Sequence, residues 1–323
     1  LLGRLMKRSY INLIKGLITN DRVCLSKLIS SIESDPSSIF KIIDSVKRIP
    51  NKVYTIGVTG PPGAGKSTLT NQIIKKFRSM DLKIGVIAID PSSPFTGGAV
   101  LGDRVRMQEH SLDTSVFIRS VGSRGDLGGL SSSTSSMIKL FDIFGMDIVI
   151  IETVGVGQTE LDIIKISDSV LVTLVPEAGD GIQAMKAGLM EIGDIFIVNK
   201  ADRGGAEKLA REIDYMVSLK HDSSSRKNKV LTTQAENDIG VDELIQEVLD
   251  FRAHEESSGA LVKKRNRRKI SELNTMVEKR LRNELEKTKE TATFKELIDK
   301  LENGLLEPEI LVQNVIDLIK KSN

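Results

Sequence analysis

The residues of this chain best suited to bind phosphate lie in a glycine-rich segment at positions 60–67, which reads GPPGAGKS. An apolar, β-branched run precedes the segment and an amphipathic run follows it, so the pattern predicts a strand, a loop and a helix. Glycines allow the backbone to curl around an anion, so that successive N–H groups point at the α- and β-phosphates of a nucleotide. The helix N-terminus adds positive potential at the same place. The segment therefore predicts a phosphate-binding loop, and the match at every fixed position argues against a chance Gly-Lys turn.

Two side chains of this loop have their own expected chemistry. Lys66 is expected on the β- and γ-phosphates, and Ser67 is expected to offer its hydroxyl to Mg²⁺. The residues that we predict to contact the nucleotide here are Gly60, Pro61, Pro62, Gly63, Ala64, Gly65, Lys66, Ser67 and Thr68.

A second motif, NKAD at 199–202, follows another apolar run and has the residues that read a guanine base. Asp202 can accept hydrogen bonds from guanine N1–H and from the exocyclic amine, a donor pair that adenine lacks. Each such charge-assisted bond contributes about 1.5–3 kcal/mol. Asn199 is expected to brace the loop, and the stem of Lys200 to cover the ring. After the next strand, Gln234 and Ala235 stand where a backbone N–H can donate to guanine O6, so the sequence predicts GTP and GDP as ligands.

Three carboxylates stand between these motifs. Asp90 and Glu152 end predicted strands, and Asp103 lies in a glycine-rich segment. Together with Ser67 they are a suitable oxygen ligand set for Mg²⁺. Taken singly, each carboxylate could instead be a turn residue or a helix cap.

The elements that must position these residues follow from a change of pattern along the chain. Apolar runs separated by helical segments extend from 53 to about 248, which predicts an α/β fold with a doubly wound, mostly parallel sheet. Ligands bind such sheets at the carboxyl ends of the strands. The predicted strands are 56–58, 84–90, 116–120, 148–152, 169–175, 195–199 and 230–233. We expect a helical region at 1–50, the nucleotide-binding domain at 51–252, and a helical, dimerising region at 253–323.

The N-terminal and C-terminal regions also carry helix boundary signals. Asp21 is a predicted N-cap, Pro36 marks a predicted helix start, Asn303-Gly304 is a stop signal, and Pro308 opens a last helix. The first sixteen residues are both basic and apolar; an amphipathic helix fits them better than a fragment of a transit peptide.

Composition limits the kinds of partner and the cellular location that we expect for this protein. The chain has 323 residues, of which 40% are hydrophobic and 28% charged, with a net charge of +2. This near balance gives no reason to expect nucleic acid or a membrane as the main partner. The single cysteine, Cys24, excludes an internal disulfide framework and fits a reducing compartment, so we expect a cytoplasmic protein. Residue 1 is not Met, so the sequence leaves open whether the N-terminus is complete.

An apolar stripe with helical spacing runs through the C-terminal region; its members are Ile270, Leu273, Val277, Leu281 and Leu285. Little chain remains to cover it, which favours a second subunit and hence a homodimer, although packing on the chain's own sheet is an equal alternative. The basic run at 263–269 lacks interleaved aromatic residues, so a solvated helix face is favoured over nucleic-acid binding.

The longer segments around these motifs resemble a known family. The segments at 90–107, 152–160, 179–188 and 199–202 are similar to those of the MeaB/ArgK family of P-loop GTPases, which includes the MMAA type. The resemblance covers about residues 10–290. It implies a fold like that of the signal-recognition and metallochaperone GTPases, and a homodimer that assists and protects an adenosylcobalamin-dependent acyl-CoA mutase, chiefly methylmalonyl-CoA mutase. An older label of this family, transport-system kinase for basic amino acids, gives the alternative function.

The resemblance also implies moving segments. It makes 90–107 the first switch, 152–160 the second, and about 175–188 a third switch that couples to the mutase. Gly155 and Gly157 leave the second switch free to move with the γ-phosphate. Asp180 and Lys186 match family positions in the third switch. The chain departs from the family pattern at Gly181, Ala184 and Ser123, which concerns the fit to the partner and not nucleotide binding.

Hydrolysis is expected to proceed by in-line attack of water on the γ-phosphate, with Lys66 and Mg²⁺ neutralising charge. No arginine finger is evident in the sequence. Lys186 is a candidate for the missing cation and Gln158 for positioning the water; the alternatives are a solvated loop cation and a plain polar loop residue. Two other functional classes remain open: a kinase, and a nucleotide-dependent assembly protein that serves no mutase.

Overall fold

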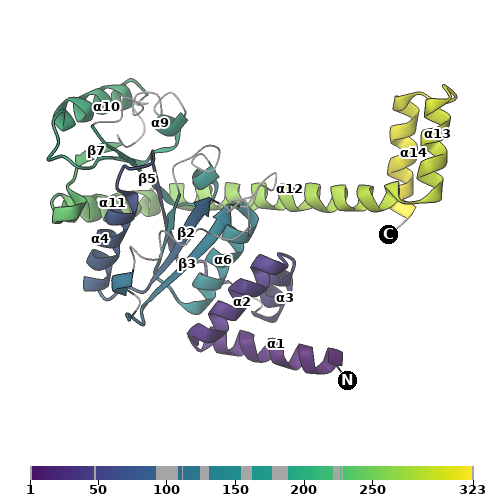
Figure 1. Ribbon diagram of the computed structural model, residues 1–323, viewed down its shortest axis with the longest axis horizontal. Coiled ribbons are helices and arrows are strands. Elements are labelled where there is room, and N and C mark those ends of the chain that lie inside the picture. Colours follow the sequence, from purple (N-terminus) through teal and green to yellow (C-terminus); the bar gives the residue numbers. More distant parts are fainter. Residues whose placement is uncertain are drawn as a thin grey trace. The chain divides into compact units, whose positions relative to one another are not determined.

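The computed structural model describes residues 2–46, 49–91, 108–110, 112–123, 131–153, 162–176, 188–220, 226 and 228–321 (Figure 1). The chain forms two compact units, Leu1–Val262 and Lys263–Asn323, which are taken separately below.

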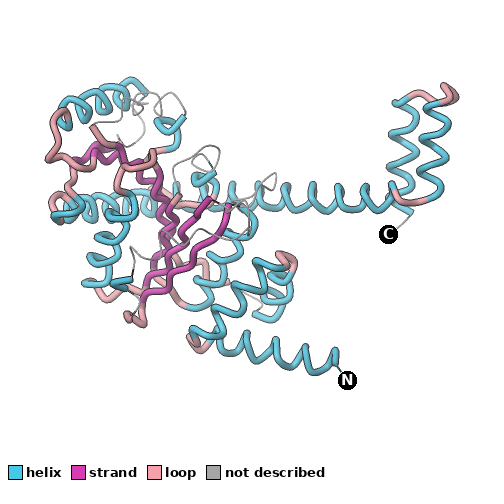
Figure 2. Tube along the Cα trace, in the orientation of Figure 1, coloured by secondary structure: helices cyan, strands magenta, loops and turns pink. Residues whose placement is uncertain are grey.

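A parallel sheet forms the centre of the first unit. Within the described residues it has seven strands in the order β3-β2-β4-β1-β5-β6-β7, and every neighbouring pair is parallel. Figure 2 shows the strands in magenta, with helices in cyan around them. The strands are β1 (Tyr54–Thr59), β2 (Ile84–Pro91), β3 (Val116–Ser123), β4 (Ile148–Glu152), β5 (Ser169–Leu174), β6 (Ile195–Val198) and β7 (Lys229–Thr232). All seven predicted strands are present, and the predicted fold class is confirmed.

Helices cover both faces of this sheet, which is why its central strands are apolar on both sides. On one face α4 (Lys66–Ser79) and α11 (Val241–Ser257) pack on β1, β2 and β4 in one core cluster. On the other face α6 (Ser131–Phe144) packs with the N-terminal helices in a second cluster. A third cluster joins α9 (Met190–Ile192) and α10 (Ala206–Lys220) to β5 and β6. Short 3-10 turns complete the unit: η1 (Gln108–His110), η2 (Ile163–Lys165) and η4 (Ala235–Asn237).

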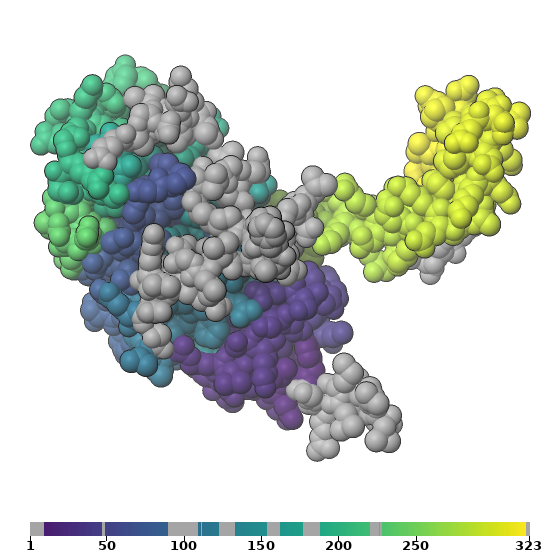
Figure 3. Space-filling view, in the orientation of Figure 1, coloured from purple at the N-terminus to yellow at the C-terminus, as the bar shows by residue number. Residues whose placement is uncertain are grey.

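The N-terminal helices are part of this unit's packing. They are α1 (Leu2–Ile18), α2 (Arg22–Ser34) and α3 (Ser38–Val46), and in Figure 3 their purple surface is continuous with the teal segments. Asp21 caps α2 as predicted, because its carboxylate accepts from the N–H groups of Val23 and Cys24. Arg119 on the edge strand β3 forms an ion pair with Glu33 of α2. The helix predicted after Pro36 begins at Ser38.

The second unit is helical. It contains most of α12 (Ala260–Lys289), with α13 (Ala292–Glu302) and α14 (Pro308–Lys321), so the predicted stop before Asn303 and start at Pro308 are both confirmed. Four members of the predicted stripe are exposed: Ile270 by 60%, Leu273 by 55%, Val277 by 48% and Leu281 by 55%. Leu285 is half-buried. The basic run at 263–269 is helical and mostly exposed.

None of the helices in the described part of the chain is long and apolar enough to cross a membrane.

One buried carboxylate fixes the chain where it enters the sheet. Asp142 of α6, only 4% exposed, accepts from the N–H groups of Lys52 and Val53, each at 3.0 Å, and from that of Asn51. Replacing it leaves these amides without their acceptor at the start of β1.

We therefore expect Asp142→Ala to lower the free energy of unfolding by about 2–3 kcal/mol, because three hydrogen bonds to a charged acceptor are lost, one of them from the buried N–H of Val53. Urea denaturation followed by circular dichroism measures the change. Asp44→Ala, which removes an exposed carboxylate from α3, is the matched control. Equal unfolding midpoints for the two variants would show that Asp142 does not hold the strand entrance.

Candidate nucleotide-binding site

The predicted phosphate-binding loop lies between β1 and α4, at the carboxyl edge of the sheet. Gly60, Gly63 and Gly65 have φ values of 139°, 76° and 83°, a region in which residues with a Cβ are strained. A Cβ on Gly60 would overlap the carbonyl oxygen of Thr173, and one on Gly65 would overlap the side-chain nitrogen of Asn199. Two of the glycines are thus required both by conformation and by close neighbours.

Lys66 is buried at the start of α4 and points back into its own loop. Its Nζ donates to the carbonyl oxygens of Gly60 at 2.8 Å and Pro61 at 3.0 Å. Pro62, Gly63 and Thr68 are exposed, and Pro61 and Ala64 are buried. The ammonium group is therefore held within the loop by backbone carbonyls.

Ser67 and Glu152 meet beside the loop. The Ser67 hydroxyl donates to Glu152 Oε1 at 2.6 Å, and both residues are buried. Glu152 ends β4 level with Val58 of β1, which explains how a residue 85 positions away reaches the first turn of α4. A hydroxyl and a carboxylate in contact are oxygen ligands of the kind that Mg²⁺ uses.

The other two predicted metal ligands are not placed. Asp90 is the residue before the end of β2, but its side chain lies outside the described residues, as does the whole of Asp103. Among the described residues no group of three or more histidines, cysteines or carboxylates could hold a metal ion. The four-residue magnesium site remains a prediction.

Asn199 joins the phosphate-binding loop to the two loops predicted to read the base. Its Nδ2 donates to the carbonyl oxygen of Ala64 at 2.9 Å. Its Oδ1 accepts from the Thr233 hydroxyl at 3.0 Å and from the Ala235 N–H at 3.1 Å. With 2% exposure, the side chain is a buried amide with both ends hydrogen-bonded.

The rest of NKAD extends this connection. Lys200 has a φ of 56°, and its Nζ donates to the carbonyl oxygen of Gly63 at 2.8 Å. The N–H of Ala201 donates to the carbonyl oxygen of Thr233 at 3.0 Å. Asp202 is exposed, so its carboxylate is accessible to a ligand. Hydrogen bonds from Asn199 and Lys200 thus join NKAD to the phosphate-binding loop.

The loop after β7 is closed on itself. Gln234 pairs with Ile239 through backbone hydrogen bonds of 2.9 and 3.3 Å, and Gly240 has a φ of 74°. A Cβ on Gly240 would overlap the carbonyl oxygen of Thr232. Ala235 is buried within this turn.

Three residues of this region were missed by the sequence reasoning: Thr233, Gln72 and Lys76. Gln72 Nε2 donates to the Ala235 carbonyl oxygen at 3.0 Å, and Lys76 forms ion pairs with Asp238 and Asp242, each at 2.8 Å. The hydrogen bond to Asp238 is the main reason why the pKa of Lys76 is raised. The i, i+4 spacing of Gln72 and Lys76 indicates that they share one helix face, but not which loop that face contacts.

The proposed catalytic residues Lys186 and Gln158 lie outside the described residues, as do Asp180, Gly181 and Ala184.

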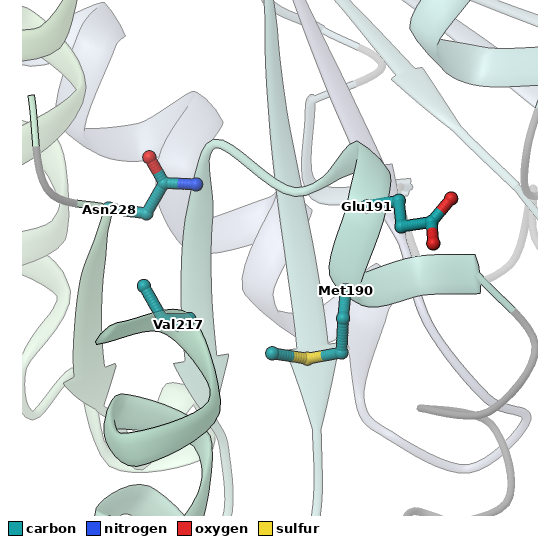
Figure 4. A pocket seen from close by; sticks show the side chains of 4 residues that line it. All are labelled: Met190, Glu191, Val217 and Asn228. Carbon is teal, nitrogen blue, oxygen red and sulfur yellow. The ribbon is translucent and has the colours of Figure 1, made fainter. Parts of the chain in front are cut away.

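A cavity of about 460 Å³ lies elsewhere in the unit (Figure 4). It is lined by Met190, Glu191, Val217 and Asn228. Asn228 precedes β7 and Met190 lies before β6, so the cavity is at the amino edge of the sheet, opposite the phosphate-binding loop.

A doubly wound parallel sheet with GPPGAGKS after its first strand and NKAD braced against that loop defines a P-loop protein of the GTPase class. The sequence pattern of one family, described as "Methylmalonyl Co-A mutase-associated GTPase MeaB", matches residues 25–290. The chain belongs to this family, and the resemblance found in its motifs is confirmed.

Proteins from an archaeon, a bacterium and a mammal are similar in sequence to most of this chain. A chain from Pyrococcus abyssi is 42% identical over 299 residues, which is 92% of each chain. GTPase ArgK of Escherichia coli is 33% identical over 282 residues, or 84% of this chain and 85% of that one. The mouse (Mus musculus) protein named "Methylmalonic aciduria type A homolog, mitochondrial" is 31% identical over 339 residues, covering 99% of this chain and 80% of its own.

The fold also matches a solved structure titled "Crystal structure of LAO/AO transport system kinase". The TM-score is 0.72 at 24% identity, with 97% of this chain and 98% of that chain covered. At this identity the likeness concerns the fold alone.

The contact between Gly65 and Asn199 gives a test of the site. Gly65→Ala forces the new Cβ toward the Asn199 amide, so the brace between the loops must shift. We expect GDP to bind at least about tenfold more weakly, since one strained backbone position and one buried hydrogen bond together cost more than 1.4 kcal/mol.

Calorimetric titration with GDP measures this loss. Gly204→Ala is the matched control, because no atom lies within 4 Å of a Cβ built there and its φ is not positive. Equal GDP affinities of the two variants would show that the contact between Gly65 and Asn199 does not matter for nucleotide binding.

Proposed function

We propose that this protein binds GTP and hydrolyses it to GDP and phosphate. The observation that carries the proposal is the Asn199 side chain, which ties Ala64 of the phosphate-binding loop to Thr233 and Ala235. Membership of a family of P-loop GTPases supports it. The alternative, a kinase or ATPase linked to basic amino-acid transport, has only a fold likeness in its favour.

Within this proposal each site residue has a role. Residues 60–68 surround the phosphates, and Lys66 exchanges its two carbonyl partners for phosphate oxygens, where it neutralises charge developing during attack by water. Ser67, Asp90, Asp103 and Glu152 would hold Mg²⁺, which when bound supplies further positive charge at the phosphates. Gln158 orients the attacking water. Gln234 and Ala235 contact guanine O6, and Asp202 accepts from the base.

The choice of base follows from Asp202. GDP should bind more than about a hundredfold more tightly than ADP, because losing two charge-assisted bonds costs about 3 kcal/mol or more. Asp202→Asn should weaken GDP and improve the binding of xanthosine diphosphate, whose O2 needs a donor. Calorimetry with the three nucleotides tests both expectations, and Asp44→Asn is the control. Equal affinities of the unsubstituted protein for ADP and GDP would refute guanine recognition.

We further propose that the protein assists an adenosylcobalamin-dependent acyl-CoA mutase, with methylmalonyl-CoA mutase as the first candidate. The description of its family and the name of its mouse relative support this. The mutase, not this chain, would hold the cobalamin. The single cysteine fits a reducing compartment, and we propose a cytoplasmic location on that basis.

If the mutase orders the third switch, it should bring Lys186 to the phosphate and speed hydrolysis. A preorganised cation supplied in this way is worth about 10³–10⁵ in rate for an arginine finger, and a lysine should give less. Single-turnover GTP hydrolysis with and without the mutase measures the stimulation. We expect Lys186→Ala to lose it while GDP affinity stays unchanged, with Lys66→Ala as the inactive reference. Full stimulation of Lys186→Ala would remove Lys186 from the reaction.

We also propose that residues 253–323 form a homodimer. The exposed members of the stripe on α12, Ile270, Leu273, Val277 and Leu281, support this, because so much apolar area on one helix face is a feature of subunit contacts. Within the described part of the second unit nothing buries them.

Leu281→Glu should dissociate the dimer, because an unpaired charge buried in an interface costs several kcal/mol. The separated chains should remain folded, since Leu281 is 55% exposed. Analytical ultracentrifugation gives the mass, and Leu305→Glu, at a 72% exposed position between α13 and α14, is the control. A Leu281→Glu protein that sediments as an unchanged dimer would exclude the stripe from the interface.

A further inference from the structure

Helix α4 contacts the loop after β7 through two side chains one turn apart. Gln72 Nε2 lies 3.0 Å from the Ala235 carbonyl oxygen, and Lys76 Nζ lies 2.8 Å from carboxylate oxygens of Asp238 and Asp242. Positions i and i+4 of a helix share one face, so the two side chains form a single row toward this loop. The same helix begins at Lys66, in the phosphate-binding loop.

Ala235 is therefore held at both of its peptide groups. Its N–H donates to Asn199 Oδ1 at 3.1 Å, and its carbonyl oxygen accepts from Gln72. The residue is 1% exposed, so little freedom remains for the turn that contains it. Under the function proposed above, the turn that contains this residue contacts guanine O6, and the two hydrogen bonds decide where that turn lies.

The hydrogen bond from Gln72 to the Ala235 carbonyl needs a donor, and the donor can be removed without changing the size of the side chain. A carboxamide donates to a carbonyl oxygen, whereas the isosteric carboxylate of glutamate has only acceptors and repels it. The ion pairs of Lys76 are a weaker support, because Asp238 and Asp242 are 45% and 75% exposed and surface pairs contribute little. Gln72 is thus the contact on which the position of Ala235 depends more strongly.

We infer that Gln72 is a positioning residue for recognition of the nucleobase, holding Ala235 at a fixed place relative to the helix that starts at the phosphates. The inference rests on the guanine-binding function proposed above and adds a residue outside every loop that contacts the nucleotide. Under this inference α4 positions both the loop that binds the phosphates and the loop that binds the base.

The test compares GDP and ADP affinities of Gln72→Glu by calorimetry at fixed salt and magnesium. GDP should bind about three- to tenfold more weakly, which is the effect of one hydrogen bond of about 0.5–1.5 kcal/mol, while ADP affinity stays within experimental error. The ratio of the two affinities therefore falls by the same factor. Gln72→Lys, which restores a donor, should recover most of the GDP affinity.

Two further proteins complete the experiment. Gln246→Glu makes the same substitution at an exposed position of α11, where the side chain donates to Asp250 of the same helix, and should leave the ratio unchanged. Gln72→Ala removes the donor without adding charge, and stands in for Gln72→Glu if the glutamate variant does not fold.

The outcomes separate this inference from the proposed function. An unchanged GDP-to-ADP ratio in both Gln72→Glu and Gln72→Ala, or equal weakening of both nucleotides, overturns the inference while guanine recognition stands. Equal binding of GDP and ADP by the unsubstituted protein overturns the proposed function, and the inference with it. A ratio that falls in Gln72→Glu and recovers in Gln72→Lys supports both.

Discussion

The buried amide of Asn199 is the interaction on which the arrangement of this site depends. One side chain satisfies a carbonyl of the phosphate-binding loop and two donors of the loop after β7, so three segments far apart in sequence share one reference point. Because an unsatisfied buried amide costs free energy, none of the three can move alone without breaking a hydrogen bond. The glycine at 65 is part of the same constraint, since any Cβ there would meet the Asn199 side chain.

Much of this architecture could be predicted because its signals are local. The strands are continuous apolar runs, as strands buried on both faces must be, and 148–152 was predicted to the residue. The loop at 60–67 and NKAD are short motifs whose chemistry is contained in adjacent residues. What could not be predicted are contacts between distant positions: Gln72 with Ala235 is separated by 163 residues, and Asp142 with Lys52 by 90. No periodicity or spacing records such pairs.

The C-terminal region shows a similar limit. Helical spacing identified the apolar stripe from Ile270 to Leu281, and these residues are exposed. The same spacing included Leu285, which is half-buried, whereas at this level α12 buries the polar residues Glu284 and Thr288. Periodicity finds an apolar face but does not say which part of the face its own chain covers. That decision depends on tertiary contacts, which helical spacing does not record.

The central claim is that the phosphate-binding loop, NKAD and the loop after β7 form one guanine nucleotide site. Hydrogen-deuterium exchange with and without GDP tests it most directly, because each loop contributes its own backbone amides. We predict that saturating GDP slows exchange at residues 60–68, 199–202 and 233–239 together, and that ADP at the same concentration does not. Protection confined to 60–68, or equal protection by ADP, would contradict the account.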